Sequence, residues 1–257
     1  MAHLKPIWKN ALVNDPDFLK NEPETQAFLY QNLNLNELEK MPQTPAVLTE
    51  ILMRENLSDE KQNAVLSELA KQIQTSEIQT LINVISKFPE SKKGSNHPLL
   101  TRLLSSSKED LLKEKEGLLR FYTGEKTDFL RQNILAAMII SESISLLSDE
   151  FLSSDNLHGK NTKQNSSDEQ NSSDDKVYDL CKAIQFLPTA ELRKSLVNDI
   201  KKGLNHSDEK TQNAAVEALA FLPEFDSEKL NWILPKLDNP VFHENIAFAF
   251  QSLNLNI

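Results

Sequence analysis

Glycine and cysteine are scarce in this chain of 257 residues, which contains five glycines and one cysteine. Tight β-hairpins and phosphate-binding loops need glycine backbones, so both are disfavoured. No GxSxG, GxxxxGK[ST] or GxGxxG motif occurs in the sequence. The single cysteine, Cys181, excludes an internal disulfide and a multi-cysteine metal site. We therefore expect no disulfide framework, no nucleotide-binding loop and no cofactor held by cysteines.

Dense runs of basic residues are also missing. The chain carries 28 Lys and Arg residues against 38 Asp and Glu residues, which gives a formal net charge of −10. Its densest basic groups are the pairs Lys92-Lys93 and Lys201-Lys202. An acidic chain repels phosphate backbones, and a basic helix is needed to bind an anionic membrane surface. We therefore expect no nucleic-acid partner and no binding to a membrane surface.

Long apolar runs are absent as well. The longest strongly apolar run covers residues 134–140, far fewer than the roughly 20 residues needed to span a bilayer, so no membrane insertion is expected. The first ten residues, MAHLKPIWKN, lack the basic and apolar regions of a signal peptide. These features predict a soluble chain that is cytoplasmic by default.

One stretch is used twice in the sequence. Residues 207–222, SDEKTQNAAVEALAFL, echo residues 58–70, SDEKQNAVLSELA. In both, a serine suited to an N-cap, Ser207 or Ser58, precedes acidic residues that the helix dipole favours at this end. The alanines that follow would let a neighbouring helix approach closely. The repetition predicts two similar helices within a fold of helical repeats.

Helical periodicity continues along most of the chain, and no stretch alternates with period two for long enough to predict a strand. Residues 44–73 form a predicted helix pair of about 30 residues, near the length of known helical repeats. We therefore predict an all-α fold, a HEAT/armadillo-like α-solenoid of antiparallel helix pairs, after an irregular lead-in at residues 1–22. The expected helices cover residues 24–32, 35–41, 44–54, 58–73, 76–88, 98–104, 108–122, 127–141, 144–152, 177–187, 189–204, 207–222, 227–237 and 239–253.

Residues 153–175 differ in composition from the rest of the chain. Ser, Asn, Asp, Lys and Gln dominate this segment, and apolar side chains nearly vanish. Such a segment cannot bury enough surface to offset the entropy lost on ordering, so we predict a disordered Ser/Asn/Asp-rich linker. The linker would separate an N-terminal helical-repeat segment, residues 1–152, from a C-terminal one, residues 176–257.

No set of residues predicts a catalytic, cofactor-binding or metal site. No two of the five histidines are three or four residues apart, so no helix presents a zinc-binding pair. Cys181 lies in an apolar helix, where burial is expected because nothing nearby would lower its pKa. Solvated or structural positions are also expected for His206, for His243 with Glu244, and for the acidic residues Asp168, Glu169, Asp174 and Asp175.

Four arginines lie on predicted helices close to apolar residues. We expect each to bond the C-terminus of a neighbouring helix, with ligand binding as the alternative. Arg131 stands out because it begins a helix that should be buried. The four residues are Arg54, Arg120, Arg131 and Arg193.

The sequence resembles a known family over most of its length, from Pro6 to Leu237. The residues that carry the likeness are Thr44-Pro45, Leu52-Met53-Arg54, Leu66–Ala70, Arg131-Gln132, Ala136-Ala137, Leu187-Pro188 and Leu192-Arg193. With these motifs, and most clearly over residues 42–71, the sequence is similar to the HEAT-like helical region of large bacterial multidomain proteins that also carry a c-type haem (cytochrome c-linked) domain.

The resemblance implies an exported, periplasmic module that holds an adjacent haem or sugar-active domain. This chain has no Cys-x-x-Cys-His motif for attaching a haem, so no cofactor is expected. We expect a non-catalytic scaffold or spacer whose partner is another protein or an adjacent domain of a longer chain. The alternative is an enzyme on a HEAT-like scaffold, DNA glycosylase-like or bilin lyase-like. A positive groove containing Trp232 and a carboxylate would favour this alternative, for which Trp8 is the second candidate aromatic residue.

Overall fold

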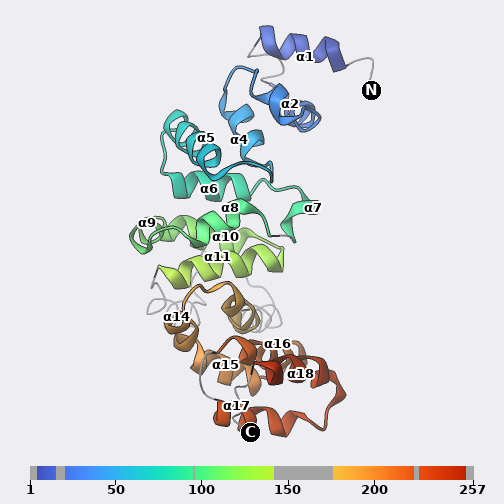
Figure 1. Cartoon of the computed structure of the whole chain (residues 1–257), viewed down its shortest axis with the longest axis vertical. Helices are drawn as coiled ribbons and strands as arrows, with labels where there is room; N and C mark the ends of the chain where they lie inside the picture. The colour runs from blue at the N-terminus through green and yellow to red at the C-terminus, as the bar shows by residue number, and fades with distance from the viewer. Residues whose placement is uncertain (1–4, 16–20, 95, 142–175, 223–225, 253–257) are drawn as a thin grey trace, which may run out of the picture. The chain divides into compact units, whose positions relative to one another are not determined.

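The computed structural model describes residues 5–15, 21–94, 96–141, 176–222 and 226–252. Across these residues the chain forms helices and no strand, which confirms the all-α prediction (Figure 1). None of the helices in this part of the chain is both long and apolar enough to cross a bilayer. The chain divides into two compact units, Met1–Thr101 and Arg102–Ile257.

The helices of the N-terminal unit pack largely in chain order. α2 and α3 each lie against α4, α4 lies against α5, and α5 lies against α6 (Figure 1). The bounds are α1 (Lys5–Asn14), α2 (Pro23–Gln31), α3 (Leu35–Leu38), α4 (Pro45–Leu52), α5 (Asp59–Gln72), α6 (Glu77–Ile85), α7 (Glu90–Lys93) and α8 (Pro98–Leu104), whose last three residues fall in the C-terminal unit.

The lead-in contains a helix. α1 carries Pro6 in its first turn, and α2 begins at Pro23. Proline costs little at these positions, because the first amides of a helix have no partner within it. The prediction of an irregular lead-in was therefore wrong for residues 5–14, since these prolines mark helix starts rather than breaks.

Side-chain caps begin three helices of this unit where the sequence predicts them. Thr44 precedes α4 as its N-cap, Ser58 Oγ accepts from Lys61 N at 3.3 Å, and Ser76 Oγ accepts from Gln79 N at 3.0 Å. The apolar faces predicted for α4, α5 and α6 are buried and form the core of the unit. These residues are Val47, Leu48, Ile51, Leu52, Val65, Leu66, Leu69, Ile78, Leu81, Ile82 and Ile85.

Phe28 and Ile73 are apolar residues within the predicted helices 24–32 and 58–73, yet both are exposed. Phe28 on α2 is 47% exposed, and the buried residues at this end are Tyr30 and Leu33. Ile73 is 37% exposed because it is the C-cap of α5, where the backbone leaves the helix (φ −90°, ψ 4°). A three-and-four pattern marks a helix face correctly only as far as the helix continues.

The C-terminal unit consists of α-helices joined to short 3₁₀ helices, written η. α10 lies against α11, α15 against α16, and α16 against α18. α11 is buried on all sides over residues 132–139. The bounds are α9 (Lys108–Lys113), α10 (Lys115–Gly124), α11 (Asp128–Ile140), a helix at 176–183, η2 (Ile184–Phe186), α14 (Ala190–Ser195), α15 (Val197–Leu204), α16 (Glu209–Ala218), η3 (Leu219–Phe221), α17 (Asp226–Ile233), η4 (Leu234–Lys236), η5 (Pro240–Phe242) and α18 (His243–Gln251).

Two helices predicted to be continuous are broken. The helix expected over 108–122 divides at Glu114, where the backbone departs from helical geometry (φ −102°, ψ 18°). Leu112 is consequently 47% exposed, while Leu111 and Leu118 are fully buried. The helix expected over 189–204 divides at Leu196, which is buried and bonds to the carbonyl three residues earlier instead of four.

The two similar helices are α5 and α16, and the capping residue of α16 lies one position later in the repeated sequence than that of α5. Ser58 caps α5, but the N-cap of α16 is Asp208, whose carboxylate accepts from Thr211 N and Oγ1 at 2.8 Å. The serines are 149 positions apart, whereas the Gln-Asn-Ala that follows recurs after 150, because Thr211 is an extra residue. The prediction of Ser207 as the cap was therefore wrong, since the added residue moves the start of the helix by one.

Replacing Asp208 with alanine should lower the free energy of unfolding by about 1 kcal/mol near neutral pH. The hydrogen bond from the Thr211 side chain holds the pKa of Asp208 below its ordinary value. The ionised cap therefore stabilises the fold above the unfolded-chain pKa, and this contribution disappears as pH falls through the folded value. Urea unfolding should show a deficit that shrinks in acid. Ser207→Ala is the matched control, and an equal deficit in both variants would contradict the assignment.

α15, α16 and the helix at 176–183 meet at a point of close approach. A Cβ atom on Gly203 would lie 2.9 Å from Ala215 Cβ, 2.9 Å from Cys181 Sγ and 3.6 Å from Val177 Cγ1. Gly203, Ala215 and Cys181 are all buried. The alanines of α16 thus allow close helix packing, as predicted. The helices packed against α16 are chiefly α15 and α18.

The predicted linker at 153–175 and the helix expected at 144–152 lie outside the described residues. The helices on either side of this segment belong to one unit, in which α11 lies against η2. The two helical segments predicted from sequence therefore meet in the structure.

Candidate functional site: a buried ion-pair network

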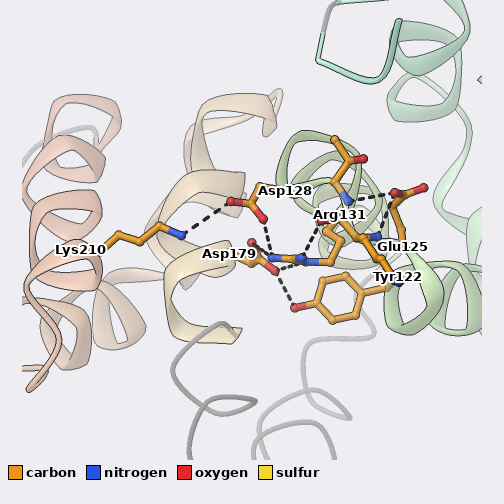
Figure 2. A network of polar contacts seen from close by, with 8 residues as sticks. Tyr122, Glu125, Asp128, Arg131, Asp179 and Lys210 are labelled. Carbon is orange, nitrogen blue, oxygen red and sulfur yellow. Dashed lines mark hydrogen bonds and ion pairs between the residues drawn. The ribbon is translucent and has the colours of Figure 1, made fainter. Parts of the chain in front are cut away.

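A buried polar network in the described part of the C-terminal unit is centred on Arg131 and Asp179. Arg131 Nε donates to Asp179 Oδ2 at 2.9 Å, and Arg131 Nη2 donates to Asp179 Oδ1 at 3.2 Å (Figure 2). This is a bidentate pair, in which two parallel hydrogen bonds fix the guanidinium and the carboxylate in one plane. It joins α11 to the helix at 176–183 across 48 positions of sequence.

Tyr122 completes the surroundings of the carboxylate. Its hydroxyl donates to Asp179 Oδ2 at 3.0 Å from α10 (Figure 2). The Asp179 side chain has no exposed surface, and Tyr122 is 5% exposed. Three hydrogen bonds from two side chains therefore replace the water that a buried carboxylate loses.

A second, outer set of contacts reaches the surface. Arg131 Nη2 donates to Asp128 Oδ1 at 2.9 Å, and Lys210 Nζ lies 3.7 Å from Asp128 Oδ2 (Figure 2). Lys210 also lies over the ring of Tyr178, 4.0 Å from its centroid. Because Asp128 is about half exposed and Lys210 more so, this outer part contributes less to stability than the buried pair.

The pKa shifts of the central pair follow from burial and proximity. Burial raises the pKa of Asp179 above its usual value, against the opposing effects of Arg131 and Tyr122. Burial would lower the pKa of Arg131, but its hydrogen bond to Asp179 and the charges of Asp179 and Asp128 together raise it. Arg131 therefore stays charged, and its positive charge favours the ionised form of the buried Asp179 carboxylate.

Local sequence fixes the position of Arg131. It lies in the first turn of α11, whose N-cap is Thr127. Glu125 Oε1 accepts from the backbone amides of Lys126 and Thr127 at 2.9 and 2.8 Å, which holds the turn before the helix. Arg131 Nη1 donates to Lys126 O at 3.4 Å. The turn and the helix start thus aim the guanidinium at Asp179.

Two of the other predicted arginines bond helix ends as expected. Arg54 Nη2 donates to the carbonyls of Tyr30, Gln31 and Leu33 at 3.0–3.3 Å, at the C-terminal end of α2. Arg193 Nε donates to Leu187 O at 3.0 Å, where η2 ends. Arg120 is exposed on α10. Arg131 differs from the prediction, because its main partner is a buried carboxylate rather than a helix C-terminus.

The candidates for acid-base or metal chemistry are not brought together. Cys181 is buried as predicted, and burial raises the pKa of its thiol to about 12. His206 Nδ1 accepts from Asp208 N at 3.1 Å, and the exposed His243 lies with Nε2 2.9 Å from Leu237 O. Over the residues that the structure describes, no group of three or more His, Cys, Asp and Glu side chains could hold a metal ion. The acidic residues Asp168, Glu169, Asp174 and Asp175 lie outside those residues.

Trp232 does lie beside a cation and a carboxylate. Lys201 Nζ is 4.6 Å from the centroid of the Trp232 ring, and Glu228 Oε2 is 3.9 Å from the same Nζ. Both charged side chains are about half exposed. Trp8, the other candidate aromatic residue, is partly buried on α1 in the N-terminal unit.

Sequence reasoning missed Asp179 and Tyr122, although one signal was available. Asp179 is the only acidic residue in the largely apolar segment VYDLCKAIQFL, residues 177–187. An acidic residue on the buried face of a helix needs a partner, because an unpaired buried charge is very costly. That reasoning predicts a cation near Asp179, but it does not identify Arg131.

Comparisons with protein-family models, with curated proteins and with solved structures find no match for this chain.

Proposed function

We propose that this chain is a non-catalytic helical-repeat scaffold, a protein-interaction or spacer module with HEAT-like pairing of its helices. The observation that carries the proposal is the repeated helix. α5 lies between α4 and α6 in one unit, and α16 lies between α15 and α18 in the other. Repeated helical units of this kind bury their apolar faces against each other and leave an extended surface for a partner.

The hydrogen bonds that the charged side chains make within the protein support the same proposal. Arg131 and Asp179 satisfy each other, and Arg54 bonds to three backbone carbonyls. These side chains join helices to one another, so their charges serve packing within each unit. In the setting of the family resemblance, the partner would be an adjacent haem-bearing or sugar-active domain.

The proposal is tested by photo-cross-linking in cells that contain the natural partner. A benzophenone amino acid replaces Phe28 or Phe248, which are 47% and 42% exposed, and the matched control replaces Phe242, which is 3% exposed. An exposed position should give one discrete adduct with another protein, and the buried position should give none. The captured protein, once purified, should bind the full chain in a calorimetric titration. The absence of a discrete adduct from both exposed positions would contradict the proposal.

A DNA-directed enzyme on the same scaffold is the second candidate, favoured by the Trp232, Lys201 and Glu228 group. The net charge of −10 argues only weakly against DNA binding, because much of it is concentrated in one segment. Residues 142–175 hold eight acidic and two basic residues, which account for −6 of that charge. Fluorescence anisotropy with a DNA duplex at low salt separates the candidates. The enzyme predicts binding that Trp232→Ala abolishes, and the scaffold predicts no binding.

A further inference from the structure

His97 is a buried histidine that bridges two helix ends in the N-terminal unit. It precedes Pro98, the first residue of α8, and is 1% exposed. Its Nε2 lies 3.2 Å from the carbonyl of Met53, which is the C-cap of α4. Its Nδ1 accepts from Leu99 N at 3.2 Å, in the first turn of α8. One imidazole ring thus contacts the end of one helix and the start of another.

These two contacts fix the protonation state of the ring. An Nδ1 that accepts a hydrogen bond cannot carry a proton, so the proton lies on Nε2, which then donates to Met53 O. Both contacts are hydrogen bonds only in this neutral tautomer. The His97 carbonyl also accepts from Leu100 N at 2.9 Å, so backbone and side chain together hold the first turn of α8.

A second proton would break this arrangement. Protonated Nδ1 would present an N–H to the N–H of Leu99 at 3.2 Å, and two donors cannot bond to each other. The ring is 1% exposed and lies with its centroid 4.6 Å from that of Phe88, so the added charge would have almost no water around it. A buried unpaired charge and a lost cap both favour release of the ring.

The neighbouring charges do not compensate. Lys92 on α7 donates to the same Met53 carbonyl at 2.6 Å and opposes a second positive charge there. Glu55, in the turn after α4, favours the charged ring, but it is 57% exposed and lies 3.8 Å from Lys92. On α4 itself, Glu50 is paired with Arg54 at 2.8 Å.

We propose that His97 is a proton-controlled latch, which holds the start of α8 on the C-terminal end of α4 while the ring is neutral and releases it when the ring is protonated. Release would remove the His97 contact from the Met53 carbonyl and expose the Phe88 ring, so the latch would couple the local structure of residues 97–101 to mildly acidic pH.

The direction of the pH dependence follows from the pKa. Burial is the main cause that lowers the pKa of His97 below its ordinary value of 6.5, and the bond to Met53 opposes it. A base with a lowered pKa in the fold stabilises that fold above the unfolded-chain pKa, and the contribution is lost as pH falls through the folded value. The latch is therefore closed at neutral pH and opens in acid.

Hydrogen exchange of the full chain, read by mass spectrometry at about pH 7.5 and about pH 5, tests the latch in the range where histidine titrates. Rates are divided by the intrinsic rates at each pH, and α5 serves as the internal reference. The protection of the amides of residues 99–101 from exchange should fall relative to that of α5 as the pH is lowered below the ordinary histidine pKa. The expected fall is up to about tenfold for each pH unit. His97→Gln cannot be protonated in this range and should remove the pH dependence. His243→Gln, at an exposed histidine, should retain it.

A second measurement keeps the test decisive if His97→Gln does not fold. Long-range ¹H–¹⁵N spectra of the wild-type imidazoles should show His97 protonated at Nε2 alone near neutral pH, with a pKa below its ordinary value of 6.5. A His97 ring that titrates at or above its ordinary pKa would overturn the latch. Equal loss of protection in the wild type and His97→Gln would overturn it as well.

Discussion

Replacing Arg131 with methionine is expected to lower the free energy of unfolding of the C-terminal unit by about 3–5 kcal/mol, because Asp179 would remain buried without its charged partner. Methionine keeps much of the length of the arginine stem, so the loss is due mainly to charge and hydrogen bonding. In a Trp8→Phe background, Trp232 is the only tryptophan. Its fluorescence then follows urea unfolding of the C-terminal unit.

The pH dependence of the Arg131→Met variant distinguishes this cause from a packing defect. Burial already raises the pKa of Asp179, and without Arg131 it should rise further. A carboxyl with a raised pKa in the fold favours folding below the unfolded-chain pKa, and this contribution is lost as pH rises through the folded value. The deficit should therefore shrink in acid. Arg120→Met, at an exposed arginine of α10, is the control, and a deficit of equal size in both variants would contradict this role for Arg131.

The substitution Ala215→Leu should have the second largest effect. Ala215 on α16 has no exposed surface and faces the backbone of Gly203. A larger side chain would push α15 away and strain the contact with Cys181, at a cost of about 1–3 kcal/mol. The same Trp232 fluorescence reports the loss as a lower urea midpoint. The equivalent residue of α5 is Val65, which has a larger side chain.

Ala247→Leu provides the control for overpacking, because Ala247 is exposed on α18. It should leave the urea midpoint nearly unchanged. Gly203→Ala should be destabilising in the same sense as Ala215→Leu, since its Cβ would lie 2.9 Å from two atoms. Wild-type stability in both Ala215→Leu and Gly203→Ala would show that α15 and α16 are not closely packed.

Helix starts and faces were predictable from sequence because their causes are local. Thr44 with Pro45, and Ser58, cap their helices within three residues, and the apolar residues of α6 follow one helical face. Predictions failed where one residue changed the register. The extra Thr211 moved the cap from Ser207 to Asp208.

The candidate site was much less predictable, because its partners are distant in sequence. Arg131 and Asp179 are 48 positions apart, and Tyr122 is 57 positions from Asp179. A buried charge needs a partner of opposite charge, so a partner could be expected for both Arg131 and Asp179. Only the packing of the helices determines which residue that partner is. The role of His97 was hidden for the same reason, since Met53 lies 44 positions away.

The most direct test of the structural role of the Arg131–Asp179 pair is a double-mutant cycle in the Trp8→Phe background. The free energy of unfolding is measured for Arg131→Met, for Asp179→Leu and for the two together. If the pair serves to join helices rather than to bind a ligand, each single variant should have a lower free energy of unfolding than the parent. The free energy of unfolding of the double variant should then be within about 1 kcal/mol of the parent value, or higher than it. Losses that simply add, within about 0.5 kcal/mol, would show that the two side chains act independently and would contradict this role.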